Sequence, residues 1–137
     1  MPGFVLGPAE GRAYGFHGST VVMKATGSIT LGQLAVMEST YPAGLSVHEH
    51  VHDGEDEMFY LLAGEISGSC EAERWIAGPG SFVFVPRNCR HGFVVTSAEP
   101  ARALVITGPP RLDRQIADRD EAPPEEAPPD EPPVAAR

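Results

Sequence analysis

The sequence contains only two cysteines, Cys70 and Cys89, in 137 residues. Two cysteines are too few for the disulfide framework that stabilises small secreted domains. The N-terminal segment MPGFVLGPAEG also lacks the basic start and the long apolar region of a secretory signal. We therefore expect reduced thiols and a cytoplasmic protein.

Long apolar runs and positive charge are scarce as well. No segment approaches the ~20 consecutive apolar residues that a membrane-spanning helix requires, so we expect no membrane partner. Lysine and arginine number 10 against 19 aspartates and glutamates, which gives a net charge of −9. There is no helix-turn-helix pattern and no basic segment. A protein with this charge does not bind nucleic acid by neutralising phosphates.

The acidic residues fall in two parts of the chain. One group lies beside histidines between residues 48 and 57, and residues 109–137 hold eight more acids against four bases. We place an all-β domain at residues 1–108 and an acidic, proline-rich tail at 109–137. Within the tail, 111–121 can form a short charged helix. The rest has six prolines and no aromatic residue, and we expect it to be disordered because it buries too little apolar surface.

Helical periodicity is nearly absent before residue 110. Short runs rich in valine, isoleucine, phenylalanine, tyrosine and threonine alternate with glycine and proline turns, which is typical of a sandwich or barrel. Gly44, Gly64 and Gly80 are expected at tight corners of the sheet. A double-sheet jelly roll covers the edges of many short antiparallel strands. The predicted strands are residues 20–25, 28–41 with a kink near Gly32, 46–52, 57–62, 65–71, 73–76, 81–85, 91–96 and 101–107.

Residues 47–59 read VHEHVHDGEDEMF, with a histidine at every second position from 48 to 52. Side chains two residues apart on a strand point to the same face, and imidazole is a common ligand of transition metals. A turn at Asp53 and Gly54 then brings Glu57 opposite the histidines, and His91 can join from a later strand. The pattern predicts one divalent ion that keeps open positions for a guest, as catalytic sites do.

A simpler reading is that these histidines are hydrogen-bonded pocket residues, which is the usual role of a single inward histidine. Three on one strand face, followed by a run of acids, fit that reading poorly, because buried imidazoles without partners are costly. His17 lies far from the others in the sequence and is not assigned to the site.

Two segments resemble the sequence motifs of the cupin superfamily. Gly44-x5-His50-x-His52-x4-Glu57-x6-Gly64 is similar to the first motif, and Gly80-x5-Pro86-x4-His91 to the second. Asn88 stands where glycine is usual, but asparagine tolerates a left-handed backbone. Val95 stands where asparagine often ends the motif. The resemblance implies a double-stranded β-helix, that is, a cupin jelly-roll barrel, with the metal ligands His50, His52, Glu57 and His91.

Within the superfamily, residues 85–93 and 96–107 look similar to quercetinases and to bacterial polyketide cyclases. That likeness implies a metal-dependent enzyme acting on a small aromatic or polyketide-like substrate. With Fe, Mn, Ni, Co or Cu the reaction could be dioxygenation, and with Zn only cyclisation or isomerisation; the ligand set accepts all of these ions. The alternative class is a small-molecule-binding cupin without catalysis.

The remaining expectations concern the pocket. Glu57 can serve both as a ligand and as a general base. His48 lines the pocket mouth or replaces His50 or His52 as a ligand. Cys89 is a small buried thiol or a fifth ligand. Strand parity directs Phe59, Leu61, Phe93, Cys89 and Val95 inward and Tyr60 outward, and Val36, Met37, Tyr41 and Phe84 are further candidates for an apolar, aromatic-walled pocket.

Small jelly rolls of this family commonly dimerise through edge strands. The strand signals at 20–25 and 28–36 could pair across such an edge. We therefore expect a homodimer.

Overall fold

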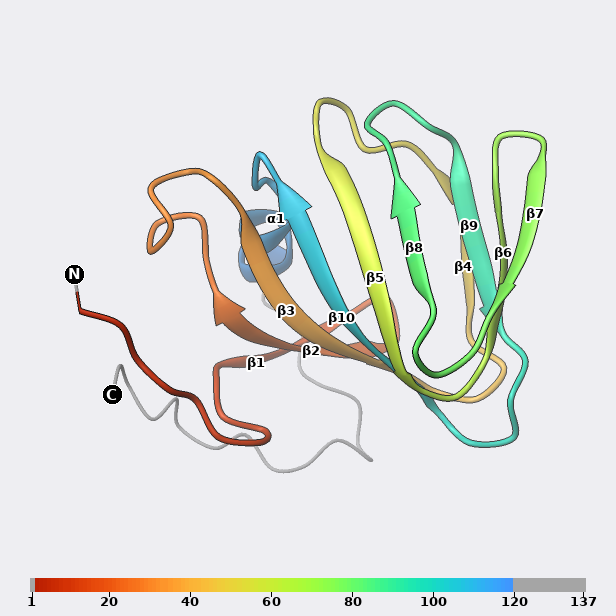
Figure 1. Cartoon of the computed structure of the whole chain (residues 1–137), viewed down its shortest axis with the longest axis horizontal. Helices are drawn as coiled ribbons and strands as arrows, with labels where there is room; N and C mark the ends of the chain where they lie inside the picture. Colours follow the sequence, from red (N-terminus) through yellow and green to blue (C-terminus); the bar gives the residue numbers. More distant parts are fainter. Residues whose placement is uncertain (1, 120–137) are drawn as a thin grey trace.

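The computed structural model describes residues 2–119, which form ten strands and one helix. The strands pair in two antiparallel sheets, with orders β1-β2-β3-β10-β5-β8 and β4-β9-β6-β7. In Figure 1 the smaller sheet lies on the right, beside β8. The elements are β1 (Ala13–Phe16), β2 (Ser19–Ala25), β3 (Ala35–Tyr41), β4 (Ser46–His50), β5 (Asp56–Ala63), β6 (Ile66–Cys70), β7 (Glu73–Ala77), β8 (Phe82–Val85), β9 (His91–Val95), β10 (Ala101–Gly108) and α1 (Leu112–Arg119).

Strict alternation in the central strands of the larger sheet builds the core. Every second side chain of β3, from Ala35 to Tyr41, is buried, and the residues between them are half-buried. β10 alternates in the same way and lies between β3 and β5; its antiparallel register is continuous with β3 and shifts once against β5, between Arg102 and Ala103. Because strand side chains alternate between faces, one face of these strands packs inward. This inward face carries Glu57 and Phe59 of β5.

Three motif glycines occupy the corners expected of them. Gly44, Gly64 and Gly80 have φ values of 78°, 77° and 87°, a region that disfavours residues with a side chain. At Gly64 a Cβ atom would also lie 2.6 Å from the Cα atom of Ala101. Asn88, at the position where the motif has glycine, adopts a φ of 67°, so its predicted left-handed conformation is confirmed.

The predicted strand at 28–41 is wrong in its N-terminal half. Residues 28–34 form turns, and the strand begins only at Ala35. The Thr30 hydroxyl closes this turn by donating to the Leu34 carbonyl oxygen at 2.6 Å. Leu31 is 87 % exposed, so the apolar residues of this stretch mimic a strand without being buried. The short strand β1, which pairs with β2, has no counterpart among the predictions.

Helix α1 belongs to the folded unit. Leu112 and Ile116 are 7 % and 1 % exposed and join the main hydrophobic core. The carboxylate of Asp113 also accepts a hydrogen bond from the backbone N–H of Gly27 at 2.8 Å. The fold therefore continues past the boundary placed at residue 108. The predicted disorder of the tail, and the end of the predicted helix at 120–121, lie outside the described residues.

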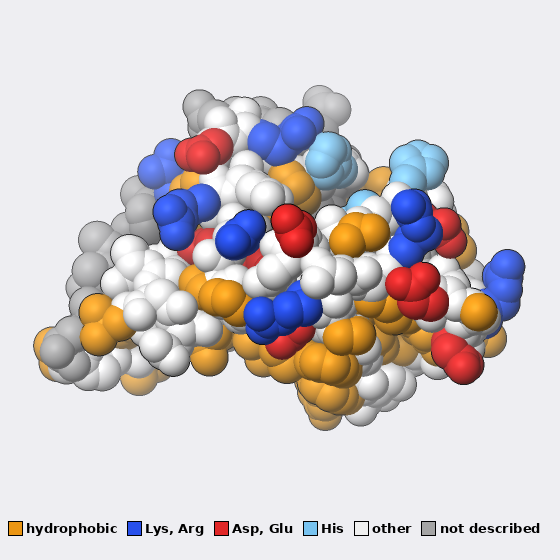
Figure 2. Space-filling model, turned by 90° about the horizontal axis from the view of Figure 1, so that it is seen from above, with side chains coloured by type: hydrophobic (Ala, Val, Ile, Leu, Met, Phe, Trp, Pro, Cys, Tyr) orange, Lys and Arg blue, Asp and Glu red, His pale blue; other side chains and the backbone are white. Residues whose placement is uncertain are grey.

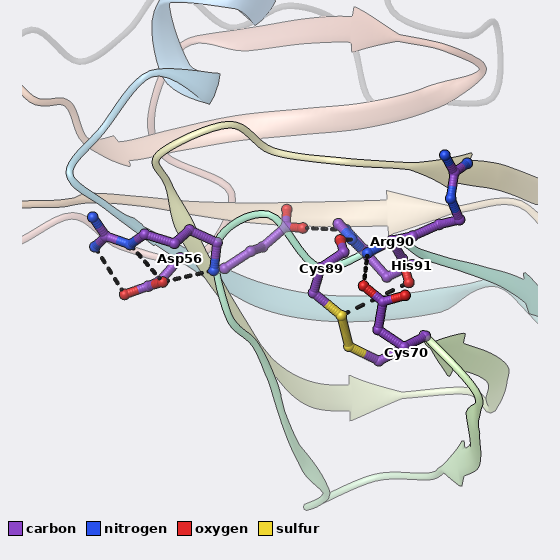
Figure 3. The surroundings of a disulfide bond; sticks show 8 residues. Asp56, Cys70, Cys89, Arg90 and His91 are labelled. Atoms are coloured by element: carbon purple, nitrogen blue, oxygen red, sulfur yellow. Dashed lines mark hydrogen bonds and ion pairs between the residues drawn. A yellow bond between two sulfur atoms is a disulfide. The ribbon is translucent and has the colours of Figure 1, made fainter.

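Cys70 and Cys89 form a disulfide, with their Cα atoms 6.3 Å apart (Figure 3). The bond joins the end of β6 to the loop that precedes β9. The expectation of reduced thiols is therefore wrong, and Cys89 is neither a free thiol nor available as a metal ligand. Pairing of β6 with β9, which sets Cys70 opposite His91, brings the two cysteines together, and their sequence separation alone does not reveal this. The inference of a reducing compartment loses its basis.

Two further expectations concern partners. Within residues 2–119 no helix is long and apolar enough to cross a membrane. In the larger sheet β2 lies between β1 and β3, so the segment 20–25 presents no free edge to a second chain. The expected route of dimerisation is therefore wrong for that segment, and the homodimer itself stays a prediction.

Replacing both cysteines, as in Cys70→Ser/Cys89→Ser, should lower the free energy of unfolding by about 3 kcal/mol, because the bridge closes a loop whose ends are 19 residues apart and restricts the unfolded chain. Urea unfolding of the variant and of the oxidised wild type measures the difference. As a control, alkylation of the unfolded protein without reductant should leave both residues unmodified. Modification of both would contradict the bond.

Truncating Ile116 to alanine should destabilise the protein by about 2–5 kcal/mol, the range for such changes in packed cores. Arg114→Ala, on the exposed side of the same helix, should change stability by less than about 0.5 kcal/mol. Thermal unfolding of the two variants provides the comparison. Equal stability of both variants would show that α1 does not pack on the barrel.

Candidate metal centre

The four predicted ligands come together at one end of the smaller sheet. His50 ends β4 and lies opposite His91, the first residue of β9. His52 follows two residues later in the loop, and Glu57 projects inward from β5. One ligand atom from each of these four residues lies within 4.8 Å of every other. Side chains from β4, β9, the loop after β4 and β5 of the larger sheet therefore meet at one point.

The shortest contacts join the atoms that would hold an ion. His91 Nε2 lies 3.0 Å and His52 Nε2 3.4 Å from the same carboxylate oxygen, Oε1 of Glu57. His50 Nε2 lies 3.1 Å from His52 Nε2. All three imidazoles thus present the same ring nitrogen to the shared centre.

The other nitrogen of each ring is held from outside the cluster. Nδ1 of His50 lies 2.8 Å from the carbonyl oxygen of His48, and Nδ1 of His91 lies 3.0 Å from that of Cys89. Nδ1 of His52 lies 3.5 Å from Oε1 of Glu55. A carbonyl or carboxylate oxygen only accepts hydrogen bonds, so each outer contact suits a ring with its proton on Nδ1, the neutral tautomer that offers the Nε2 lone pair to a metal ion.

When all three rings carry their protons on Nδ1, three lone pairs and a carboxylate oxygen face one point, an arrangement that a cation between them would stabilise. Divalent transition metals take neutral imidazole and carboxylate ligands, and partners at the second ring nitrogen fix the tautomer that ligates. The donor set therefore fits a divalent metal ion, as the sequence predicts. Nothing in the set selects among the candidate metals.

The surroundings shift the histidine pKa values in opposite directions. Burial, together with the neighbouring His91 and His52, lowers the pKa of His50. Burial also acts to lower the pKa of His52, but its hydrogen bond with Glu55 and the charge of Glu57 outweigh that effect and raise it. His50 therefore stays neutral, and ready to ligate, to lower pH than His52 does.

His48 does not join the cluster. A register shift between Val47 and His50 interrupts the pairing of β4 with β9, so the strict alternation expected for the three histidines fails at this point. The side chain of His48 is exposed and lines the mouth of the cavity, while its backbone carbonyl holds His50. The structure thus favours the pocket-mouth role for His48. Histidine side chains are visible at the surface in Figure 2.

A cavity of about 710 Å³ opens over the cluster. Phe59 and Phe93 line it, as the parity of their strands predicts, and so do Met37 and Tyr41. The rings of Phe59 and Phe93 both contact other aromatic rings edge to face: the Tyr41–Phe93 centroids are 5.0 Å apart and the Phe59–Phe93 centroids 5.9 Å. The cavity therefore has aromatic walls beside a polar metal centre.

Several residues expected in the pocket lie elsewhere. Leu61 is 1 % exposed and Val95 is 3 % exposed, and both belong to the hydrophobic core without lining the cavity. Phe84 is 51 % exposed, because its parity on β8 directs it outward. Tyr60 faces outward as predicted. Cys89 is removed from the pocket by its disulfide, and Val36 is half-buried outside the cavity lining.

The structure also adds residues that the sequence did not single out. Glu55 is 2 % exposed and is a second buried carboxylate beside the one assigned to Glu57. His17 lines the mouth of the cavity, so it is not remote from the site. Leu112 and Ile116 of α1 form part of the wall. The sequence gives no sign that His17 or α1 lies at the cavity, because both are brought there by tertiary packing. The run of acids around Glu55 is visible in the sequence, but it does not show which of those acids is buried.

Tyr41 supplies a neutral hydroxyl to the cavity. Burial and the nearby negative charge of Glu57 raise the pKa of Tyr41 far above its ordinary value, and a hydrogen bond with Ser39 offsets this only partly. The phenol therefore keeps its proton at neutral pH. It can donate a hydrogen bond to a guest but cannot act as a base.

The loop that carries His91 is tied to the loop that carries His52. The backbone N–H of Asn88 donates to the carbonyl oxygen of His52 at 2.9 Å, and its side chain accepts from the N–H of Gly54 at 3.3 Å. Arg87 and Asp56 form an exposed ion pair on the other side, and the backbone of Arg90 donates to Glu71 (Figure 3). The two contacts of Asn88 hold the loop of His52 beside the loop that leads to His91.

Comparison with known proteins agrees with the fold. Residues 37–107 match the family model described as a cupin domain, so this chain belongs to the cupin family. The chain is also similar to quercetin 2,3-dioxygenase of Bacillus subtilis, with 32 % identity over 68 residues. That match covers 50 % of this chain but only 20 % of the relative, so the chain spans about a fifth of the enzyme it resembles.

Solved structures share the same architecture. A protein described as a predicted oxalate decarboxylase from Thermotoga maritima superposes with a TM-score of 0.70 at 18 % identity, covering 76 % of this chain and 97 % of that one. An RmlC-like cupin from Shewanella frigidimarina gives a TM-score of 0.69 at 18 % identity, covering 83 % and 96 %. At these identities the likeness shows the fold alone.

Protein purified without a metal-affinity tag should contain about one divalent transition ion per chain, and His91→Ala should lose it. His48→Ala is the matched control: it removes an imidazole from the cavity mouth but keeps the backbone carbonyl that holds His50, so the ion should remain. Elemental analysis of the three proteins measures the content. Loss of the ion in His48→Ala would instead make His48 a ligand.

Proposed function

We propose that this cupin is a metal-dependent enzyme that acts on a small, flat aromatic substrate bearing an enol or phenol oxygen. The observation that carries the proposal is the meeting of the His50, His52, Glu57 and His91 cluster with an aromatic-walled cavity of about 710 Å³. The cavity has the size and the mixture of apolar walls and few polar groups that are usual for small-molecule sites.

A bound divalent ion would act as a Lewis acid and template for the substrate oxygen. Glu57 belongs to the cluster and is 5 % exposed, which supports a role for its carboxylate in taking the proton of a substrate hydroxyl at the ion. General-base catalysis requires such a group within hydrogen-bond reach. Glu57 thus combines the two roles predicted for it: it helps hold the ion, and it takes the proton.

The cavity walls orient the substrate. Phe59 and Phe93 offer ring surfaces that stack on or pack against a planar ligand. Tyr41 donates a hydrogen bond without competing for the proton. Leu112 and Ile116 close the wall on the helix side and exclude water, which strengthens polar interactions inside the site.

Dioxygenation is the reaction we put first. The support is the similarity to quercetin 2,3-dioxygenase over 68 residues, a stretch half as long as this chain. Metal-promoted cyclisation or isomerisation, as in the polyketide cyclases that the sequence resembles, uses the same cluster and the same base but consumes no oxygen. Measurement of oxygen therefore separates the two reactions.

With a flavonol as probe, the metal-loaded wild type should consume oxygen in proportion to substrate loss. Phe93→Ala should raise KM by about tenfold or more, because it removes a ring from the cavity wall and such buried contacts contribute ~1–3 kcal/mol. Phe84→Ala, which removes an exposed ring from the outer face, is the matched control and should leave KM unchanged. Glu57→Gln should lower kcat.

Two results would contradict this assignment. Turnover of the flavonol without oxygen consumption would replace dioxygenation with redox-neutral chemistry. Absence of both turnover and a thermal shift with flavonols and related phenols would refute the aromatic substrate, since a ligand that binds the native state must stabilise it.

A further inference from the structure

Glu55 is a buried carboxylate that the proposed reaction does not use. It lies two residues before Glu57, is 2 % exposed, and is not among the four residues of the metal cluster. A buried charge is costly unless it is paired and hydrogen-bonded, so its partners show what the fold gains from it.

The two oxygens of Glu55 face different parts of the protein. Oε1 lies 3.5 Å from Nδ1 of His52. Oε2 accepts hydrogen bonds from the backbone N–H groups of Arg111 and Leu112, at 2.7 Å and 2.9 Å. Those N–H groups are at the start of α1, where a helix has no internal acceptors for them. One carboxylate therefore joins a predicted metal ligand to the start of the helix that walls the cavity.

From this bridge we propose that Glu55 is the positioning residue that keeps His52 ready to bind metal, by holding the proton of its imidazole on Nδ1 and leaving Nε2 free, while it anchors α1 over the same cavity. The inference rests on the metal part of the proposed function. It assigns Glu55 no contact with the substrate and no part in the chemistry.

Glu55 matters because the three histidines differ in the group that contacts Nδ1. Backbone carbonyls hold the rings of His50 and His91, and no substitution of a side chain removes these acceptors. His52 alone depends on a side chain. A single substitution of Glu55 can therefore change the orientation and tautomer of His52 without replacing a ligand. Residues that hydrogen-bond a metal ligand from outside in this way typically contribute 10–100-fold to metal affinity.

Glu55→Gln separates the two functions of the bridge. Glutamine keeps one carbonyl oxygen, which can still accept from the N–H groups of Arg111 and Leu112. Its amide nitrogen then faces Nδ1 of His52 and donates, which favours the tautomer with hydrogen on Nε2, the form that cannot ligate. The helix should stay in place while the metal site weakens.

The test measures zinc affinity by competition with a chromogenic chelator. We expect Glu55→Gln to bind zinc about 10–100-fold more weakly than wild type, with an unchanged near-ultraviolet circular dichroism spectrum. Asp56→Asn is the matched control: it removes the same charge from the next residue, whose carboxylate pairs with exposed Arg87. Its zinc affinity should stay within about threefold of wild type, because exposed charges are screened.

A second measurement uses the wild type alone, so it does not depend on the variant folding. Nitrogen-15 NMR of the histidine rings in zinc-loaded protein should show hydrogen on Nδ1 of His52. An Nδ1 without hydrogen would overturn the inference. So would wild-type zinc affinity in Glu55→Gln, or an equal loss in Asp56→Asn.

Failure of the wider proposal has a different signature. If wild-type protein binds no divalent ion, the metal-dependent function is lost together with its metal site. If wild type binds zinc tightly and Glu55→Gln binds it equally well, the metal site stands and only the role of Glu55 is refuted.

Discussion

The structure depends on one electrostatic constraint: three ring nitrogens and a carboxylate oxygen are made to face a common point. Left alone, such groups would turn away from one another or exchange protons. They stay because the second nitrogen of each ring is held elsewhere, by the carbonyl oxygens of His48 and Cys89 and by the carboxylate of Glu55. These outer contacts keep the three Nε2 atoms directed at the shared centre, where a divalent cation would bind them together with Glu57.

The jelly roll suits this constraint because its two sheets bring separate stretches of chain to one place. Antiparallel pairing sets His50 opposite His91, and the inward parity of β5 supplies Glu57 from the other sheet. Asn88 then ties the loop after β4 to the loop before β9, and the disulfide ties this second loop to the end of β6. Three of the ligands lie at or next to strand ends, and His52 lies in the loop between β4 and β5.

The ligands and most of the strands could be predicted from the sequence because they depend on local spacing. The motif fixes His50, His52, Glu57 and His91, and alternation predicts Phe59 and Phe93 inside. What escaped prediction depends on distant contacts. The pairing of Cys70 with Cys89 follows from the register of β6 and β9, and the contribution of α1 follows from burial of Ile116. The position of His48 follows from a bulge that strict alternation does not anticipate.

The cavity wall formed by α1 comes from the last described stretch of the chain, whereas every metal-cluster residue lies between 50 and 91. The helical part of the cavity wall and the metal cluster are therefore encoded in separate stretches of the chain. Substitutions in the helix could change which compounds fit the cavity while the metal cluster stayed intact. Glu55 is the residue that connects the helix to the cluster. Such modularity gives a small barrel a route to new selectivity that does not begin by breaking its chemistry.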